Sequence, residues 1–410
     1  MRASPRFLPT VVILWTAFFA INFNIAMMIP LLPFIQRDIG LSPAQAAMVL
    51  AAFPLVSLSA NLALGPFIDR FGRKRFLVAG GTGCAIVLTA TALSRDVVFL
   101  IAGRAVTGLF MPMIGASVFA ATADYIPAPS RARVTGYVTT AAPFAFLLAM
   151  SIGVFLGGLV AWQFPVVFLA VLCLLLAGGA ATLPPPDPGD LASGPVTRRT
   201  YRDRLLSLSL DAGTRLLLPA YFCWAAAVVT FMGLYPSWMV QRGLAGHGVG
   251  VIGSMLVVGE AGGLFGAFFS GRLSLLFRHP LGLCATAAFG VAAVVLLVPF
   301  GAGMPWLQAS LYAAFAFGRD LMLALMLGGA ILLVGAAQRG SLNAILNALY
   351  QTGAAVGGVV SAWLYAFRPD FLANSLAAAG LLCLSGAMLG GIARLGRGAA
   401  PQGAGPNPTP

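Results

Sequence analysis

A short basic loop between two long apolar runs decides the fold: Gly65-Pro66-Phe67-Ile68-Asp69-Arg70-Phe71-Gly72-Arg73-Lys74-Arg75. The runs on either side, near 44–65 and 76–94, contain no charged residue. Each is about as long as the roughly 20 residues that a helix needs to cross the hydrocarbon layer of a bilayer. The pattern therefore predicts two membrane-spanning helices joined by a tight basic turn.

The composition of the whole chain agrees with this prediction. Of the 410 residues, 60% are hydrophobic and 9% are charged, whereas soluble domains have about 25% charged residues. Soluble enzymes, nucleic-acid-binding proteins and secreted disulfide-rich scaffolds are therefore excluded. The five cysteines lie in apolar runs without metal-ligand spacing, so we expect small buried packing residues and no metal site.

Apolar runs of this kind recur along the chain and predict twelve transmembrane helices. They lie near 9–34, 44–65, 76–94, 97–119, 134–160, 163–183, 215–240, 249–270, 281–300, 305–335, 341–366 and 371–393. One long polar segment separates six of these runs from the other six. We therefore expect an all-α integral membrane fold of two pseudo-symmetric bundles. The predicted parts are an N-terminal bundle (1–183), a cytoplasmic linker (184–214), a C-terminal bundle (215–397) and a disordered tail (398–410).

The positions of the basic residues predict the orientation in the membrane. With both termini in the cytoplasm, the cytoplasmic loops receive 18 of the 24 Lys and Arg residues, as the positive-inside rule requires. The net charge of +13 then indicates contact with membrane lipid, without a nucleic-acid partner. A bacterial-type inner membrane location is the expectation.

The two halves also resemble each other. Gly65 and Gly271 precede corresponding loops, and Arg133 and Arg339 precede corresponding helices, each pair 206 positions apart. Two repeated six-helix bundles are one of the architectures of secondary transporters, which bind substrate at the repeat interface.

The loop 65–75 resembles the signature loop of the major facilitator superfamily, Gly-x-x-x-Asp-Arg-x-Gly-Arg-Arg/Lys-Arg. In that family the loop latches the two halves in one conformation. The resemblance implies this role for Gly65, Asp69, Arg70, Gly72 and Arg73. Taken alone, the loop is also compatible with a plain positive-inside loop in which the glycines allow a tight turn and Asp69 caps a helix start.

Two further motifs resemble those of twelve-helix drug:proton antiporters: Pro30-x-x-Pro33-x-Ile35, and Arg104-x-x-x-Gly108 with its buried arginine. The proline of the family's antiporter motif is missing near Gly153, where Val154 follows. The resemblance implies a secondary transporter that works by alternating access, and we favour proton-coupled efflux of small amphipathic compounds or drugs. The alternatives are a specific exporter or importer of a sugar, amino acid or siderophore, and, in another class, a non-transporting sensor or membrane-embedded enzyme.

Only four ionisable side chains fall at bilayer depth: Arg104, Glu260, Arg319 and Asp320. Such residues cost about 2.5–3.5 kcal/mol or more each in a bilayer, so they need a partner or a function. A carboxyl group that alternates between an apolar environment and a neighbouring arginine can take up and release a proton. We expect these four residues to couple transport to protons. An ion pair that only fixes helix packing is the other interpretation of Glu260, Arg319 and Asp320, and the last two need not pair because adjacent helical residues diverge by about 100°.

The family resemblance places the first, fourth, seventh and tenth helices around a central cavity. The candidate substrate-binding residues there are Asn22, Asn24, Met111, Trp224, Phe231 and Phe315. The two asparagines can instead bond to a neighbouring helix, and only one of them can face the cavity. For the aromatic residues, core packing is the other interpretation, and Tyr235 and Trp238 are expected in an interfacial aromatic belt.

Residue spacing predicts two kinds of helix contact. Asn343, Asn347 and Gln351 recur every four residues and form a polar stripe that either lines a substrate path or joins helices. Gly153 with Gly157, Gly259 with Gly263, and Gly353 with Gly357 have the spacing for close helix packing.

The sequence also indicates what the protein lacks. It has no phosphate-binding glycine-rich loop, which argues against direct ATP drive, and no cluster of nucleophile, base or metal ligands. We therefore expect no enzymatic activity, no cofactor and no metal. The expected partners are a small-molecule substrate, protons and membrane lipid, and the expected state is a monomer.

Overall fold

The computed structural model describes residues 8–127, 134, 137–138, 140–184, 212–244, 246–274, 277, 279–333 and 339–398. Within them the chain forms twelve long helices and no strand. The helices are α1 (Leu8–Ile39), α2 (Pro43–Phe71), α3 (Arg73–Leu93), α4 (Val97–Tyr125), α6 (Ala141–Leu159), α7 (Gln163–Ala181), α9 (Ala212–Met232), α11 (Val249–Ser274), α12 (Pro280–Leu297), α13 (Pro305–Leu333), α14 (Arg339–Phe367) and α15 (Leu372–Gly398). The prediction of an all-α fold with twelve long helices is confirmed. Most of the predicted linker and tail lie outside the described residues.

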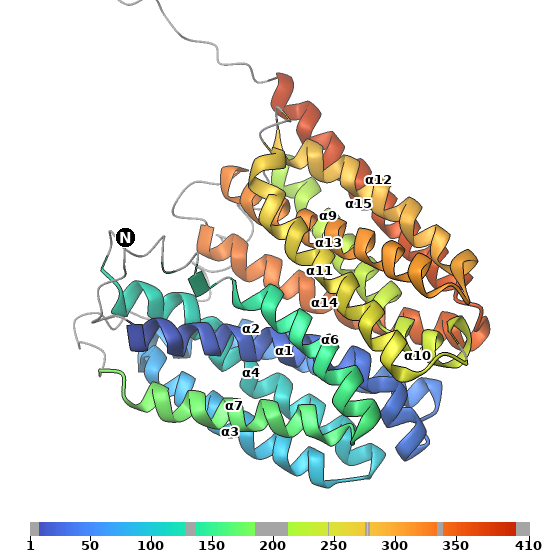
Figure 1. The fold of residues 1–410 in the computed structure, drawn as a ribbon. Helices are drawn as coiled ribbons and strands as arrows, with labels where there is room; N and C mark the ends of the chain where they lie inside the picture. Colours follow the sequence, from blue (N-terminus) through green and yellow to red (C-terminus); the bar gives the residue numbers. More distant parts are fainter. Residues whose placement is uncertain are drawn as a thin grey trace, which may run out of the picture.

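The helices form two groups (Figure 1). Helices α1, α2, α3, α4, α6 and α7 pack against one another, and α9 and α11 to α15 do the same. We call the face at which α1 begins the amino-terminal face, and the other the opposite face. Among the described residues, the most extensive contacts between the groups are those of α2 with α14, α6 with α11, and α1 with the short helix α10 (Tyr235–Trp238).

Eleven of the described helices are long and apolar enough to cross a membrane. The remaining long helix, α14, contains the predicted polar stripe and lies between α2 and α9. Because α14 is partly surrounded by protein, fewer of its side chains need to face lipid.

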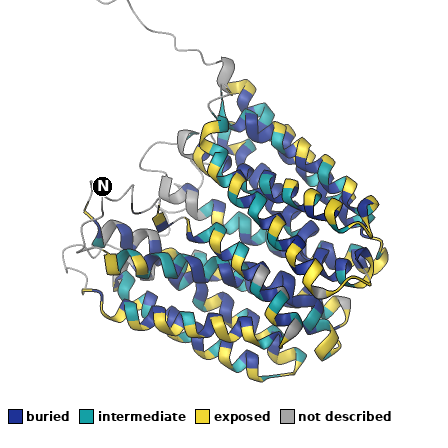
Figure 2. Ribbon diagram, in the orientation of Figure 1, coloured by how far each residue is buried: buried dark blue, intermediate teal, exposed yellow. Residues whose placement is uncertain are grey.

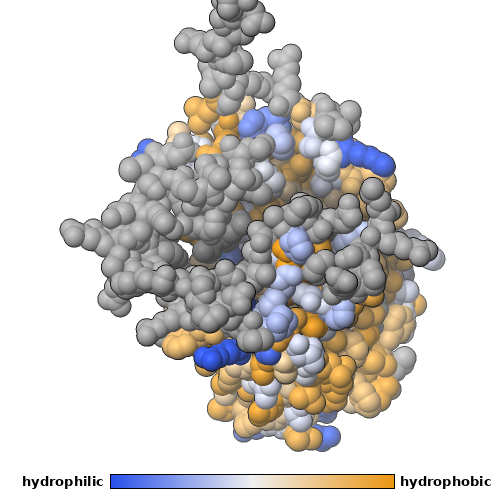
Figure 3. All heavy atoms as spheres, turned by 90° about the vertical axis from the view of Figure 1, so that its left-hand side faces the viewer, coloured by the Kyte–Doolittle hydropathy of each residue, from blue (hydrophilic) through white to orange (hydrophobic). Residues whose placement is uncertain are grey.

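The outer surface of the helices is largely apolar. Figure 2 shows buried residues along the inner sides of the helices and exposed residues on their outer sides, and many exposed residues are large and apolar. Figure 3 looks onto the side where α1 begins and shows pale and blue residues near the centre, with orange ones on the flanks.

Local sequence signals set several helix ends. Ser42 and Gln45 form a reciprocal capping box at the start of α2, with Pro43 in the first turn. Asp96 caps α4 by accepting hydrogen bonds from the Val98 and Phe99 amides at 2.5 and 3.2 Å. These caps fix the turns on the opposite face.

The predicted helix 215–240 is interrupted, which is a correction to the sequence interpretation. Helix α9 ends at Met232, and after two turn residues α10 and a π-helical turn (Met239–Gly243) continue the chain. Pro236 lacks the amide hydrogen that a continuous helix would bond to the carbonyl of Met232, so α9 cannot run on unchanged.

The glycine pairs lie at close helix contacts, as predicted. A Cβ atom at Gly153 would come 2.6 Å from Pro30 Cγ of α1, and one at Gly353 would come 2.9 Å from the Phe222 carbonyl oxygen of α9. Four of the cysteines are buried as expected, but Cys383 is exposed on α15. The prediction of a buried Cys383 was wrong, because none of the described helices covers that side of α15.

The two helix groups are also joined by hydrogen bonds. Near the middle of α2, Gln351 Nε2 of α14 donates to Ser57 Oγ at 3.1 Å, and Asn347 Nδ2 donates to Asn61 Oδ1 at 3.3 Å. Two residues of the polar stripe therefore join helices across the groups, while the side chain of Asn343 lies outside the described part. At the opposite face, Ser237 Oγ of α10 donates to Gln36 Oε1 of α1 at 3.1 Å. Beside this last bond the groups meet at an apolar surface formed by Pro30, Pro33, Phe34, Pro236, Val240, Ile252 and Leu256.

Candidate functional site

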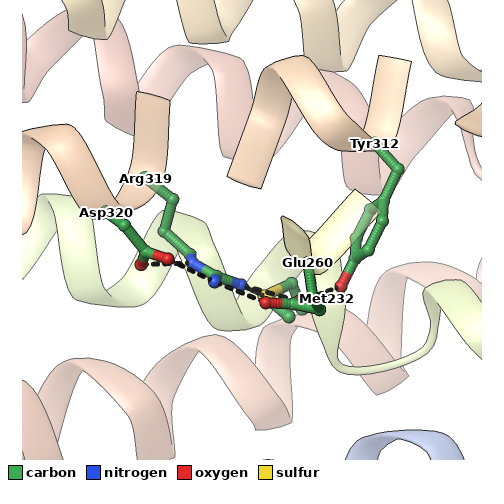
Figure 4. Close-up of polar contacts among 5 residues, drawn as sticks. All are labelled: Met232, Glu260, Tyr312, Arg319 and Asp320. Atoms are coloured by element: carbon green, nitrogen blue, oxygen red, sulfur yellow. Dashed lines mark hydrogen bonds and ion pairs between the residues drawn. The ribbon is translucent and has the colours of Figure 1, made fainter. Parts of the chain in front are cut away.

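Three of the four predicted intramembrane ionisable residues form one cluster. Arg319 of α13 donates from Nη2 to Glu260 Oε2 of α11 at 2.8 Å and from Nη1 to Glu260 Oε1 at 3.1 Å. It also donates from Nε and Nη2 to the two oxygens of Asp320, each at 2.8 Å. Figure 4 shows the guanidinium group extended between the two carboxylates. The neighbouring residues Arg319 and Asp320 therefore do pair, because the long arginine side chain brings its Nε edge back to the adjacent carboxylate.

The cluster is almost completely withdrawn from solvent. The side chains of Arg319 and Glu260 are 4% and 1% exposed, and that of Asp320 is 18% exposed. Planar guanidinium and carboxylate groups bind each other through two parallel hydrogen bonds, which is the strongest geometry for such a pair. Two carboxylates share one arginine, so their fully ionised state has a net charge of −1. A proton or another cation can balance this charge.

Two neighbouring side chains complete the site. Tyr312, two helical turns before Arg319 on α13, donates its hydroxyl hydrogen to Glu260 Oε1 at 2.6 Å. The sulfur of Met232, at the end of α9, lies 3.2 Å from Arg319 Nη1. Three helices, α9, α11 and α13, therefore meet at Glu260 and Arg319 (Figure 4).

Glycines of α11 make room for this arrangement. A Cβ atom at Gly263 would overlap Asp320 Oδ2 and lie 3.1 Å from Arg319 Nη2, and one at Gly259 would overlap the ring of Tyr312. Gly259 and Gly263 are therefore required at these positions of α11, because larger residues would displace Tyr312, Arg319 and Asp320.

One contact of the cluster crosses between the helix groups. The Cζ atom of Arg319 lies 5.1 Å from the ring centroid of Phe146, which belongs to α6 of the first group. A buried cation over an aromatic face gains about 1–2 kcal/mol. The guanidinium group therefore contacts two carboxylates of its own group and an aromatic ring of the other.

Arg104 lies apart from this cluster. Its Nη1 donates to Asn24 Oδ1 of α1 at 3.0 Å, and its Cζ lies 4.9 Å from the ring centroid of Phe53. Arg104 is 3% exposed and Asn24 is 0% exposed. Asn22 instead donates to the Phe18 carbonyl oxygen of its own helix at 2.8 Å. The two asparagines therefore have different environments, as their angular separation predicts.

The candidate aromatic residues lie in two buried groups. The rings of Phe231 and Phe315 are 4.5 Å apart and belong to a cluster with Tyr235, Trp238, Tyr312 and Phe371. Trp224 packs instead between Tyr221 and Tyr350, with centroid distances of 5.4 and 6.1 Å. Met111 is also buried.

The prediction of an interfacial belt for Tyr235 and Trp238 was wrong, since both are buried at 0% and 2% exposure. Because α9 breaks before Tyr235, α10 packs beneath the loop that contains Phe371, and its aromatic residues point into the protein. Tyr235 also donates its hydroxyl hydrogen to Gln308 Oε1 at 2.8 Å.

The signature loop forms the turn between α2 and α3. Gly72 is the single residue between these helices and has φ of 85°, a conformation that favours glycine. No described side chain caps the start of α3. Asp69 lies within α2, and the predicted capping role of its side chain stays a prediction. Gly65 also lies in α2, Arg73 is the first residue of α3, and the side chains of Asp69 and Arg70 are outside the described part of the chain.

Sequence reasoning missed Tyr312, Met232 and Phe146. The spacing of seven residues between Tyr312 and Arg319 places both on one face of a helix and could have linked them. Phe146 is one of 29 phenylalanines, and nothing in its local sequence distinguishes it.

Comparisons with known proteins agree with this architecture. The sequence profile of the Major Facilitator Superfamily matches residues 14–358. An uncharacterized MFS-type transporter, YceJ of Bacillus subtilis (strain 168), is 23% identical over 93% of this chain and 96% of its own length. The quinolone resistance protein NorA of Staphylococcus aureus (strain MRSA252) is 22% identical over 70% of this chain and 72% of its own length.

A solved structure has the same fold. A bacterial homolog of the human lysosomal transporter Spinster, in an inward-facing and unoccupied conformation, superposes with a TM-score of 0.73 at 15% identity. The superposition covers 96% of this chain and 98% of the other. With the profile match over most of the chain, these likenesses show that the protein is a multi-pass membrane transporter, not an enzyme, and that it belongs to the Major Facilitator Superfamily.

Proposed function

We propose that the protein exports small amphipathic compounds or drugs in exchange for protons. The names of its relatives support the substrate class, because NorA is a quinolone resistance protein and a second relative, from Bacillus subtilis (strain 168), is named multidrug resistance protein 1. The cluster around Arg319 supports the coupling, since two carboxylates at bilayer depth share one positive charge.

The observation that carries the coupling proposal is the triple contact of Arg319 with Glu260, Asp320 and Phe146. When a proton neutralises Glu260, the attraction between that carboxyl group and the guanidinium falls. The arginine can then turn toward Asp320, which changes its position over Phe146 in the other helix group. Protonation would thereby bias the two groups between their two arrangements, as alternating access requires.

The remaining candidate residues take supporting roles in this proposal. Trp224, Phe231, Phe315 and Met111 would provide an apolar wall for the substrate when the groups rearrange. The Nε1 atom of Trp224 is buried without an acceptor among the described residues, so it can donate a hydrogen bond to a bound compound. Asn22 would contribute a more peripheral polar contact.

The topology belongs to the same proposal. Both termini and the amino-terminal face would lie in the cytoplasm of a bacterial-type cell, as the distribution of basic residues indicates. The bundles 1–183 and 215–397 would move as units around the linker 184–214. The loop with Gly65, Asp69, Arg70, Gly72 and Arg73 would latch one arrangement, and a monomer would suffice for transport.

The test is transport by the full-length protein in proteoliposomes with an imposed pH gradient. The panel contains cationic dyes, antibiotics and metabolites. We expect gradient-dependent flux of at least one amphipathic compound, and we expect Glu260→Gln to abolish it without loss of expression. Asp370→Asn is the matched control, because Asp370 pairs with Arg368 at 2.7 Å with side chains 46% and 58% exposed. Flux without gradient dependence, or unchanged coupling in Glu260→Gln, would contradict the proposal.

A further inference from the structure

Arg104 is a buried cation that has no counter-ion among the side chains that the structure describes. Its contacts in the described structure are one hydrogen bond to a neutral amide, Asn24 Oδ1, and the ring of Phe53. By contrast, Arg319 in the other helix group contacts two carboxylates. An unpaired charge at bilayer depth is expensive, so a protein retains one where something binds it.

No acidic side chain of the protein is available to it among the described residues. Glu260 and Asp320 bind Arg319, Asp38 accepts from Trp162 Nε1, Asp96 caps α4, and Asp370 binds Arg368. All five acidic side chains that the structure describes therefore have other partners. A counter-ion for Arg104 has to come from outside this set.

Two buried donor atoms at this place have no acceptor. The Nε atom of Arg104 and the Nδ2 atom of Asn24 are buried and make no hydrogen bond in the described structure. The single bond between Arg104 Nη1 and Asn24 Oδ1 holds the two side chains together. Because both unpaired atoms are donors, the group that fits them is an acceptor.

The shape of these donors favours an anionic acceptor with two oxygens. The Nε and Nη2 atoms of a guanidinium form a planar fork that matches a carboxylate. The described residues place no acceptor on either atom of this fork in Arg104. The amide of Asn24 adds a third donor from α1.

We propose that Arg104 and Asn24 form a binding site for the carboxylate of the transported compound. This inference rests on the proposed transport of amphipathic compounds and narrows it to organic acids and zwitterions with an apolar body. The carboxylate accepts hydrogen bonds from Arg104 and from Asn24 Nδ2, and the ring of Phe53 continues to cover one face of the guanidinium. The site lies in the N-terminal helix group and is separate from the carboxylates of the C-terminal group.

Equilibrium binding to the purified full-length protein in detergent tests this proposal without any pH gradient. The probes are 1-naphthoate, its methyl ester and 1-naphthylmethylamine, which share one apolar body and differ in charge. Binding is measured by the rise of the thermal unfolding midpoint with probe concentration. We expect the wild type to bind 1-naphthoate at least about tenfold more tightly than the ester, since hydrogen bonds to charged groups contribute about that much or more.

Single-residue variants show which side chains produce the preference for the acid over the ester. Arg104→Gln should remove the preference for the acid while binding of the methyl ester is retained, which shows that the variant is folded. Asn24→Leu, which keeps the arginine, should weaken acid binding several-fold. Thr107→Val is the matched control on the helix of Arg104, because the buried Thr107 hydroxyl donates to the Gly103 carbonyl oxygen of its own helix at 2.7 Å, and it should bind the acid like the wild type.

Equal binding of acid and ester by the wild type, or an undiminished preference in both Arg104→Gln and Asn24→Leu, would overturn the proposal. Failure of the proposed proton coupling would be seen separately. In that case the acid preference in detergent persists, while flux in proteoliposomes does not respond to the pH gradient.

Discussion

Phe146 is predicted to control the balance between the two arrangements of the helix groups. It is the ring of α6 against which Arg319 of the other group lies, with 5.1 Å between Cζ and the ring centroid. Phe146→Leu keeps an apolar side chain of similar size and removes the aromatic face. The apolar contact is thus largely retained, and the main loss is the attraction between cation and ring.

The size of the effect follows from this contact. A buried cation–π interaction contributes about 1–2 kcal/mol, and each 1.4 kcal/mol is a factor of ten in an equilibrium constant. We therefore expect Phe146→Leu to lower the population of the arrangement described here about 5- to 30-fold relative to the other. Phe144→Leu is the matched control, because Phe144 lies on the same helix but is 53% exposed, and it should change the balance little.

Distances between spin labels on the opposite face measure this balance. Leu93 at the end of α3 and Phe367 at the end of α14 are 82% and 79% exposed and belong to different helix groups, so cysteines placed there can carry the labels. The exposed Cys383 is first replaced by serine, whereas the other native cysteines are buried. An unchanged distance distribution in Phe146→Leu, or an equal change in Phe144→Leu, would refute the reasoning.

Two further variants probe the same network. Gly263→Ala places a Cβ atom against Asp320 Oδ2, so it should weaken a charge-assisted hydrogen bond of about 1.5–3 kcal/mol and reduce gradient-driven flux about tenfold or more. Gly271→Ala, on the same helix with no atom within 4 Å of the new Cβ, should retain flux. Gln351→Leu removes the 3.1 Å hydrogen bond to Ser57 between the helix groups, which is expected to contribute about 0.5–1.5 kcal/mol. The spin-label distances should then shift in the same direction as for Phe146→Leu but by a smaller factor, and a larger or opposite shift would contradict this ranking.

The fold could be predicted from the sequence because its signals are local. A charge-free run of helical length predicts a transmembrane helix at its own position. The basic loop that begins at residue 65, with its glycines, likewise predicts the turn that lies there. The break after Met232 was missed, although Pro236 marks it, because a proline within an apolar run is often accommodated in transmembrane helices. That break moved Tyr235 and Trp238 from the expected surface belt into the core.

The candidate site could be predicted only in part. The scarcity of charge at bilayer depth identified Glu260, Arg319 and Asp320 as residues that need partners. The geometry of these three residues depends on the angles at which α11, α13 and α6 cross. A single sequence does not predict these angles, so it does not identify the phenylalanine that faces Arg319 from another helix. For Asn22 and Asn24 the helical periodicity correctly predicted different environments, but the partner of Asn24, Arg104, is 80 positions away.

Direct counting of protons tests the central claim, that Glu260 couples transport to protons. If proton binding weakens substrate binding, then substrate binding must weaken proton binding by the same factor, so protons are released when substrate binds. A compound found in the flux assay is added to purified protein in weakly buffered detergent solution, and the pH change is recorded with an indicator dye. We expect the wild type to release about one proton for each substrate bound, and Glu260→Gln to bind substrate without release. Equal release by the wild type and Glu260→Gln, or no release by the wild type, would contradict the account.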